Sequence, residues 1–280
     1  MRAQTLMTQW CTRAATCGQL RMSTNTNTPK HDGLDAIFKH KRLLRTQVRK
    51  TLKSIQPSLR SHQAIISLLK CDHKFSLPSP FIDNTVQDIV LGAPWFKSSR
   101  RLCAYISCAA LREVDTLKIL SQILQHNNAT DGKKLYVPRV EDKNSHMRML
   151  HISGIDDLIA NSMDILEPAP VDVDGNARED VMQANDPVDL FLLPGLAFDR
   201  SGRRLGRGRG YYDTFLKNYQ DLAKTRNWKQ PLLVALSYSE QILDEGLIPM
   251  TSSDLPVDAL VSPEGIIIKG KRAVQCPNGM

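Results

Sequence analysis

Apolar and charged residues recur at helical spacing from Gly33 onward. Charged side chains fill the intervening positions, as in an amphipathic helix that places one face on a core. The apolar positions are Leu34, Ile37, Leu44, Val48, Leu52 and Ile55. We expect this helix to end at Pro57, and the apolar segment from Leu59 to Leu69 predicts a second helix packed against it.

Further along, short apolar runs predict strands at residues 101–107, 133–140, 147–153, 188–195, 231–238, 257–262 and 265–270. Helical spacing returns between them, at residues 112–124 and 211–225. Pro138 should end the second strand, because proline cannot donate a ladder hydrogen bond. Residues 71–99 contain three prolines and predict a loop or insertion with one short helix near residues 85–90, and residues 161–186 predict a long surface excursion.

The alternation of nearly continuous apolar strands with helices favours an α/β fold. We expect three layers over residues 36–270, with a mainly parallel sheet and helices on both faces. The last two strands should form a hairpin that turns at residues 263–265. The folded part is then a single domain, residues 33–280.

The N-terminal segment, residues 1–32, has a different composition. Residues 1–31 contain four basic and no acidic residues, which is half of the net charge of +8, and they are rich in threonine. This composition is typical of an organelle transit peptide. We expect import into the mitochondrial matrix, with the chloroplast as an alternative; a merely disordered tail, which would leave the protein in the cytosol, is the other interpretation.

Composition limits the remaining classes. No apolar run approaches the roughly 20 residues of a membrane-spanning helix, so we expect no membrane association. The six cysteines form no C-x-x-C pair, and the seven histidines show no metal-binding spacing. This pattern argues against a zinc site or a disulfide framework and favours a reducing compartment.

The most unusual stretch is RRLGRGRGYYD, residues 203–213, between a predicted buried strand and a predicted helix. A helix N-terminus presents unpaired backbone N–H groups, and glycines let an anion approach them closely. Arginine adds forked donors that suit phosphate or carboxylate oxygens. The stretch therefore predicts a structured anion site at the carboxyl end of the sheet. An RNA-binding arginine–glycine segment and a purely structural turn remain alternatives.

A longer run that includes this stretch, LPGLAFDRSGRRLGRGRGYYDTFL at residues 193–216, closely resembles the signature of the 5-formyltetrahydrofolate cyclo-ligases, also called methenyltetrahydrofolate synthetases. Weaker features follow in the family's order: KRLLR at 41–45, YISCAALREVDT at 105–116, VPRV at 137–140 and ILEP at 165–168. The resemblance spans about residues 36–265. Two features depart from it, a longer segment at 72–97 and Met163 in place of an aromatic residue in the folate pocket.

The resemblance implies an enzyme that uses ATP and Mg²⁺ to convert 5-formyltetrahydrofolate to 5,10-methenyltetrahydrofolate with release of ADP and phosphate. Tyr105 and Glu113 should face the folate, and Asp213 should hold Mg²⁺ rather than only favour the helix dipole. The implied catalytic residues are Arg207, Tyr211 and Tyr212, although simple core packing is the alternative for either tyrosine. The implied ATP-binding residues are Lys41, Arg45, Arg204, Gly206, Arg207, Gly208, Arg209, Gly210 and Tyr212.

Lys41 and Arg45 lie on one face of the first helix, and such pairs ordinarily just face water. Two further function classes remain open, a phosphosugar- or CoA-binding α/β protein and, less favoured, an RNA-binding protein. On the cyclo-ligase interpretation the partner is a small-molecule folate, with or without a polyglutamate tail. We then expect a monomer that binds neither nucleic acid nor a membrane.

Overall fold

The central sheet has seven strands in the order β12-β11-β9-β6-β1-β2-β3. The computed structural model describes residues 31–54, 81–125, 132–161 and 165–268. The sheet strands are β1 (Arg101–Ala104), β2 (Lys134–Val140), β3 (Met147–Ile152), β6 (Leu190–Leu193), β9 (Leu232–Leu236), β11 (Ala259–Ser262) and β12 (Gly265–Ile268). The five inner strands run parallel, and the edge strands β3 and β12 are antiparallel to their neighbours. The mainly parallel sheet is therefore confirmed.

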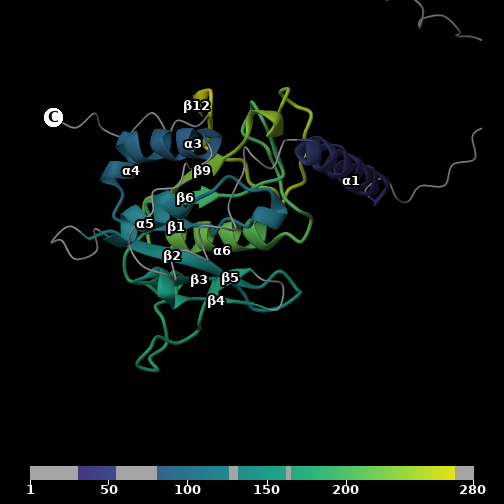
Figure 1. Cartoon of the computed structure of the whole chain (residues 1–280). Coiled ribbons are helices and arrows are strands. Elements are labelled where there is room, and N and C mark those ends of the chain that lie inside the picture. Colours follow the sequence, from purple (N-terminus) through teal and green to yellow (C-terminus); the bar gives the residue numbers. More distant parts are fainter. Residues whose placement is uncertain (1–30, 55–80, 126–131, 162–164, 269–280) are drawn as a thin grey trace, which may run out of the picture.

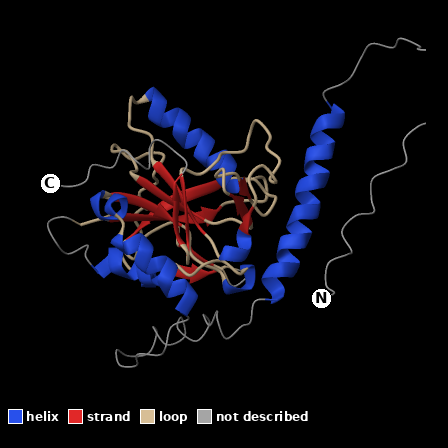
Figure 2. Cartoon of the chain, turned by 90° about the horizontal axis from the view of Figure 1, so that it is seen from above, coloured by secondary structure: helices blue, strands red, loops and turns tan. Residues whose placement is uncertain are grey.

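Helices cover both faces of this sheet, as Figures 1 and 2 show. Successive side chains of β6 point to opposite faces, so that Leu192 joins one buried cluster and Phe191 the other. The first cluster also contains residues of α3 (Phe81–Gly92), α4 (Pro94–Ser98) and α5 (Leu117–Gln125), while the second contains α6 (Tyr211–Thr225). Two cores on one sheet make the three layers that the sequence predicts.

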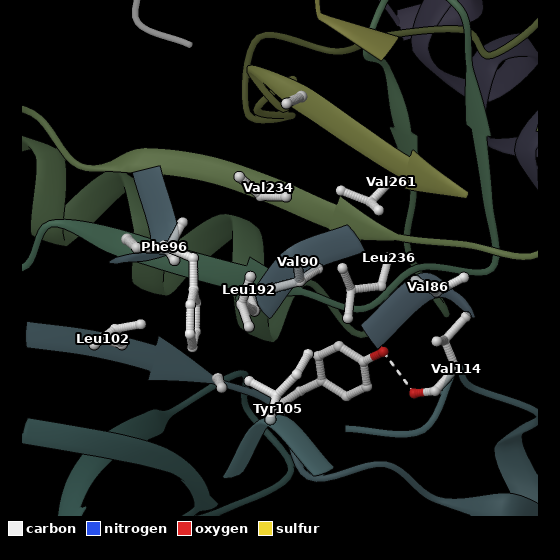
Figure 3. Close-up of a cluster of buried hydrophobic side chains, with 14 of the residues drawn as sticks. Val86, Val90, Phe96, Leu102, Tyr105, Val114, Leu192, Val234, Leu236 and Val261 are labelled. Carbon is white, nitrogen blue, oxygen red and sulfur yellow. Dashed lines mark hydrogen bonds between the residues drawn. The ribbon is translucent and has the colours of Figure 1, made fainter. Parts of the chain in front are cut away.

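The first of these cores is drawn in Figure 3, where Tyr105 packs among valine and leucine side chains from several strands and helices. Burying each such aliphatic side chain contributes about 1.5–3 kcal/mol relative to leaving it exposed. The hydroxyl group of Tyr105 donates a hydrogen bond to the carbonyl oxygen of Val114 at 2.7 Å. This bond satisfies a polar group that would otherwise be costly to bury.

The first helix, α1 (His31–Ser54), lies beside the body of the molecule (Figure 1). Val48 and Leu52 enter the first core, and Arg112 donates a hydrogen bond to the carbonyl oxygen of Leu52. The helix is thus anchored at its C-terminal half. The predicted N-terminal segment up to residue 30 and the predicted helix Leu59–Leu69 lie outside the described residues.

Two predictions for the outer part of the fold were wrong. Residues 81–98 contain α3 and the separate helix α4, not one short helix in a loop, and Pro94 lies at the start of α4, where proline is favoured. Strand β2 does not stop at Pro138 but continues to Val140. Pro138 is tolerated because it lies beyond the pairing with β1, where β2 has only β3 as a neighbour.

Short elements that the sequence did not predict complete the fold. A small sheet has the order β10-β7-β8, formed by β10 (Ile242–Leu243), β7 (Ala197–Asp199) and β8 (Arg204–Leu205). Strands β4 (Leu158–Ala160) and β5 (Leu166–Pro168) form a hairpin, with β4 just before the predicted surface excursion and β5 within it. Within the described residues, 3₁₀ turns occupy Ala109–Leu111, Ile155–Asp157 and Ser239–Gln241. The predicted hairpin of β11 and β12 is confirmed.

Candidate active site

The glycine loop, defined as residues 206–210, connects β8 to α6 beyond the carboxyl ends of the inner strands. Two of its glycines have backbone angles that L side chains rarely adopt, with φ of 110° at Gly208 and 73° at Gly210. Gly210 is the N-cap of α6. The loop therefore delivers the chain directly to a helix N-terminus, as the anion-site prediction requires.

Contacts from the β2–β3 connection hold the far end of this loop. Ser145 donates a hydrogen bond from its hydroxyl group to the carbonyl oxygen of Arg209. The hydroxyl group of Tyr211 donates to the carbonyl oxygen of Asp142 at 2.7 Å. These bonds fix the loop relative to the sheet before any ligand binds.

An open cleft, which we call the polar cleft, lies on the α1 side of the glycine loop. It measures about 1120 Å³ including its mouth, which is large enough for a small-molecule ligand. Its lining residues are Phe38, Lys41, Arg45, Gly206, Gly208, Gly210, Asp213, Thr214, Lys217, Asn218, Thr251, Ser253 and Asp254. The basic pair of α1 therefore meets the glycine loop in space, although it lies more than 150 residues earlier in the chain.

Arg45 contacts the loop directly, because its Nε donates a hydrogen bond to the carbonyl oxygen of Gly206 at 2.9 Å. Burial lowers the pKa of Arg45, and the nearby charge of Arg49 lowers it further, while Asp254 and Asp213 act in the opposite direction. Both main causes disfavour the positive charge. An anion in the polar cleft would stabilise it.

Lys41 is only 4% exposed, and its ammonium group forms an ion pair with Asp254. Burial alone would raise the pKa of Asp254, but hydrogen bonds from Lys41 and from Thr251 lower it overall. Leu255 donates its backbone N–H to Oδ1 of Asp213 at 3.5 Å, so the segment carrying Asp254 lies next to Asp213. Sequence reasoning missed Asp254, which carries no recognisable motif.

A second cleft, which we call the apolar cleft, lies across the same loop. It measures about 960 Å³ including its mouth. Aliphatic and proline side chains form much of its wall, contributed by Ile106, Leu111, Pro138, Val140, Met147, Ile165, Leu166 and Pro194. The predicted site residues Tyr105, Glu113, Arg204, Arg207, Arg209, Tyr211 and Tyr212 all line it too.

Arg207 and Glu113 form an ion pair inside the apolar cleft. The Nε of Arg207 donates to Oε1 of Glu113 at 3.1 Å, and its Nη2 donates to the carbonyl oxygen of Leu111. The other carboxylate oxygen of Glu113 accepts the backbone N–H of Cys108 at 3.2 Å. Burial raises the pKa of Glu113, although both partners oppose that shift. Glu113 therefore fixes the direction of the Arg207 side chain.

A second ion pair lies at the start of α6. Nη2 of Arg204 donates to Oδ1 of Asp213 at 2.6 Å, and the Arg204 guanidinium lies 5.8 Å from the centre of the Tyr212 ring. Burial raises the pKa of Tyr212 well above its usual value. Tyr105 is 1% exposed and uses its hydroxyl group on Val114, so it supplies wall rather than a free donor.

The two clefts share Gly206, Gly210 and Asp213 as lining residues. The other predicted residues separate into two groups. One group lines only the polar cleft and consists of Lys41, Arg45 and Gly208. The other lines only the apolar cleft and consists of Tyr105, Glu113, Arg204, Arg207, Arg209, Tyr211 and Tyr212. Met163 lies outside the described residues. Among the described residues, no group of three or more His, Cys, Asp or Glu side chains could hold a metal ion, and no helix is long and apolar enough to cross a membrane.

An α/β enzyme with a basic, glycine-bounded cleft beside an apolar one is the class that this fold and site define. The sequence profile of the 5-formyltetrahydrofolate cyclo-ligase family matches residues 38–263. The chain belongs to this family, and it is therefore a ligase.

Individual relatives agree. The chain is 59% identical over 251 residues to the mitochondrial 5-formyltetrahydrofolate cyclo-ligase of Arabidopsis thaliana, covering 90% of this chain and 84% of that protein. It is 28% identical to the mouse 5-formyltetrahydrofolate cyclo-ligase, covering 79% of this chain and 92% of the other. A solved structure of the 5,10-methenyltetrahydrofolate synthetase of Aquifex aeolicus has the same fold, with a TM-score of 0.54 at 24% identity over 81% of this chain and 93% of that one. Among the function classes left open by the sequence, family membership selects the cyclo-ligase.

Proposed function

We propose that the protein closes the ring of 5-formyltetrahydrofolate to 5,10-methenyltetrahydrofolate and consumes ATP, which leaves as ADP and phosphate. The observation that supports this most is the shared wall of the two clefts. A nucleotide in the polar cleft and a folate in the apolar cleft would meet at the glycine loop. Phosphoryl transfer between bound ligands needs that proximity more than it needs a nucleophilic side chain.

The chemistry explains why ATP is consumed. Ring closure makes a bond from N10 to the formyl carbon and breaks the bond from that carbon to its oxygen, which is a very poor leaving group as oxide or hydroxide. In the proposed reaction the formyl oxygen attacks the γ-phosphorus, and the bond between that phosphorus and ADP breaks. N10 then attacks the carbon, the oxygen departs as part of inorganic phosphate, and the N10 proton is released to solvent.

The polar cleft is the proposed ATP site. Lys41, Arg45 and Lys217 provide positive charge, and Gly206, Gly208 and Gly210 leave the backbone open to phosphate oxygens. The N-terminus of α6 adds unpaired N–H groups and its partial positive charge. Lys41 would exchange part of its interaction with Asp254 for the triphosphate.

Asp213 and Asp254 are the residues that would hold Mg²⁺. Their carboxylates line the same cleft as the basic pair, and Mg²⁺ is usually bound by one or two carboxylates together with substrate phosphates. Oδ1 of Asp213 is used by Arg204, which leaves Oδ2 for a ligand among the described contacts. When bound, the ion would neutralise part of the charge of the phosphates.

The apolar cleft is the proposed folate site. Tyr105, Tyr211 and Tyr212 supply flat walls for the ring system, and the surrounding aliphatic side chains exclude water from the reacting groups. Arg207 and Arg209 approach from the glycine loop. Their guanidinium groups can therefore stabilise the negative charge of the phosphoryl group while it is transferred to the formyl oxygen. Arg204 supports the ATP site instead, because its ion pair holds Asp213, a proposed Mg²⁺ ligand, in place.

The activity itself is the first test. Purified protein with ATP, Mg²⁺ and 5-formyltetrahydrofolate should produce the absorbance of methenyltetrahydrofolate, and omission of ATP should abolish it. A protein that stays folded but forms no product with fresh substrate would refute the proposal.

We further propose that the N-terminal segment directs the protein to mitochondria, supported by its composition and by the mitochondrial relative. All the described residues that line the two clefts lie after Gly33. A chain shortened to begin at Gly33 should therefore keep full turnover but lose import, measured with isolated mitochondria. Import of the shortened chain at the full-length rate would contradict this assignment.

A further inference from the structure

Glu167 is the exception among the carboxylates of the apolar cleft. Three acidic residues line this cleft, and two of them are neutralised, Glu113 by Arg207 and Asp213 by Arg204. Glu167 makes no ion pair within the part of the chain that the structure describes. It lies on the short strand β5 and is only 8% exposed.

The hydrogen bonds of Glu167 are equally sparse. Its Oε1 accepts the backbone N–H of Val140 at 3.4 Å, which is a long bond. Its Oε2 accepts none from the described residues. The neighbouring wall is formed by Val140, Ile165 and Leu166, which can donate nothing from their side chains. Oε2 is therefore open to the cleft and can accept hydrogen bonds from a ligand.

The strand does not need this side chain to stay in position. Strand β5 pairs with β4, and Nη1 of Arg139 donates to the carbonyl oxygen of Pro168 at 2.9 Å. The backbone is thus held by contacts that do not involve the carboxylate. A structural role would also be filled better by an uncharged residue, so the charge points to a ligand that brings its own donors.

We propose that Glu167 recognises the aminopyrimidine ring of the folate by accepting hydrogen bonds from its exocyclic amino group and the adjacent ring N–H. This proposal rests on the proposed function and names the residue that selects its substrate. The two donors of that ring lie side by side and are neutral, so they match a carboxylate that has no cation partner. Glu113, which the resemblance places facing the folate, already uses one oxygen on Arg207 and the other on Cys108.

This assignment also separates the two ends of the cleft. Glu113 and Arg207 lie at the glycine loop, where the formyl group must meet the phosphoryl group. Glu167 comes from the β4–β5 hairpin, which packs against β2. A ring held by Glu167 would be oriented within the cleft by an element that takes no part in phosphate binding.

The test compares two ligands on three proteins by equilibrium binding. The ligands are 5-formyltetrahydrofolate and its analogue with a methyl group in place of the 2-amino group, and the proteins are the unaltered chain, Glu167→Ala and Glu167→Gln. The unaltered chain should bind the amino ligand at least about tenfold more tightly, the ratio expected for a charge-assisted hydrogen bond. In Glu167→Ala that preference should fall to about twofold or less, while the KM for ATP stays unchanged.

Glu167→Gln keeps an acceptor for Val140 but loses the charge, so it should melt no lower than the unaltered chain and still lose most of the preference. Glu141→Ala removes an exposed carboxylate near the same end of β2 and is the matched control, which should keep the full preference. Retention of the tenfold preference in both Glu167 variants would overturn the inference and leave the proposed function standing. Failure of the unaltered chain to bind either folate would overturn both.

Discussion

Replacing Arg207 by alanine is expected to lower kcat by about 100- to 1000-fold, the range found when a donor that stabilises developing negative charge is removed. Arg207 comes from the loop shared by both clefts and is aimed by Glu113 and by the carbonyl oxygen of Leu111. The KM for ATP should change much less, because the side chain lines the apolar cleft. Steady-state kinetics with each substrate varied in turn would separate the two parameters.

The alanine substitution also leaves the buried carboxylate of Glu113 without its partner, which would reduce stability. The double variant Arg207→Ala/Glu113→Gln separates that effect from catalysis. It should recover the melting temperature of the unaltered chain but not its kcat. Recovery of both would mean that Arg207 acts only on the fold, and Arg200→Ala, an exposed arginine outside both clefts, should change neither.

Replacing Arg45 by alanine is expected to raise the KM for ATP by about 10- to 150-fold. A charge-assisted hydrogen bond to a phosphate is worth about 1.5–3 kcal/mol, which corresponds to that factor. Binding of 5-formyltetrahydrofolate, measured without nucleotide, should stay within about twofold, because Arg45 lines only the polar cleft.

Lys50→Ala is the matched control for Arg45. It lies on the same helix, is exposed, and does not line the polar cleft, so its removal should alter the KM for ATP by less than about twofold. Equal and negligible effects at both positions would return α1 to the interpretation of a solvated basic face. Lys41 is less suitable for this comparison, since its loss would also leave Asp254 half-buried and unpaired.

The glycine loop could be predicted because its information is local. Gly208 and Gly210 require positive φ, and α6 begins at Tyr211 as its spacing predicts. Phe191 and Leu192 enter different cores, which likewise follows from a strand that is buried on both faces. Those signals were sufficient for the class of fold and for the position of the glycine loop at the start of α6.

Other features depend on contacts that no local pattern encodes. Asp254 follows a short polar loop and has no spacing that marks it, while Glu167 lies in the ILEP run, to which the resemblance attached no side-chain role. Their importance appears only when α1 and the β4–β5 hairpin are placed around the glycine loop. The loop predicted from the prolines of residues 71–99 was wrong for a different reason. Proline is favoured at the start of a helix, and Pro94 begins α4.

The fate of the formyl oxygen tests the central claim most directly. In the proposed reaction this oxygen becomes part of inorganic phosphate, so turnover of 5-formyltetrahydrofolate labelled with ¹⁸O in the formyl group should yield phosphate carrying one ¹⁸O, detected by mass spectrometry. The phosphate should carry this label from the first to the last turnover when the reaction is run in unlabelled water. Unlabelled phosphate, with the ¹⁸O recovered in water, would contradict phosphoryl transfer between the two clefts.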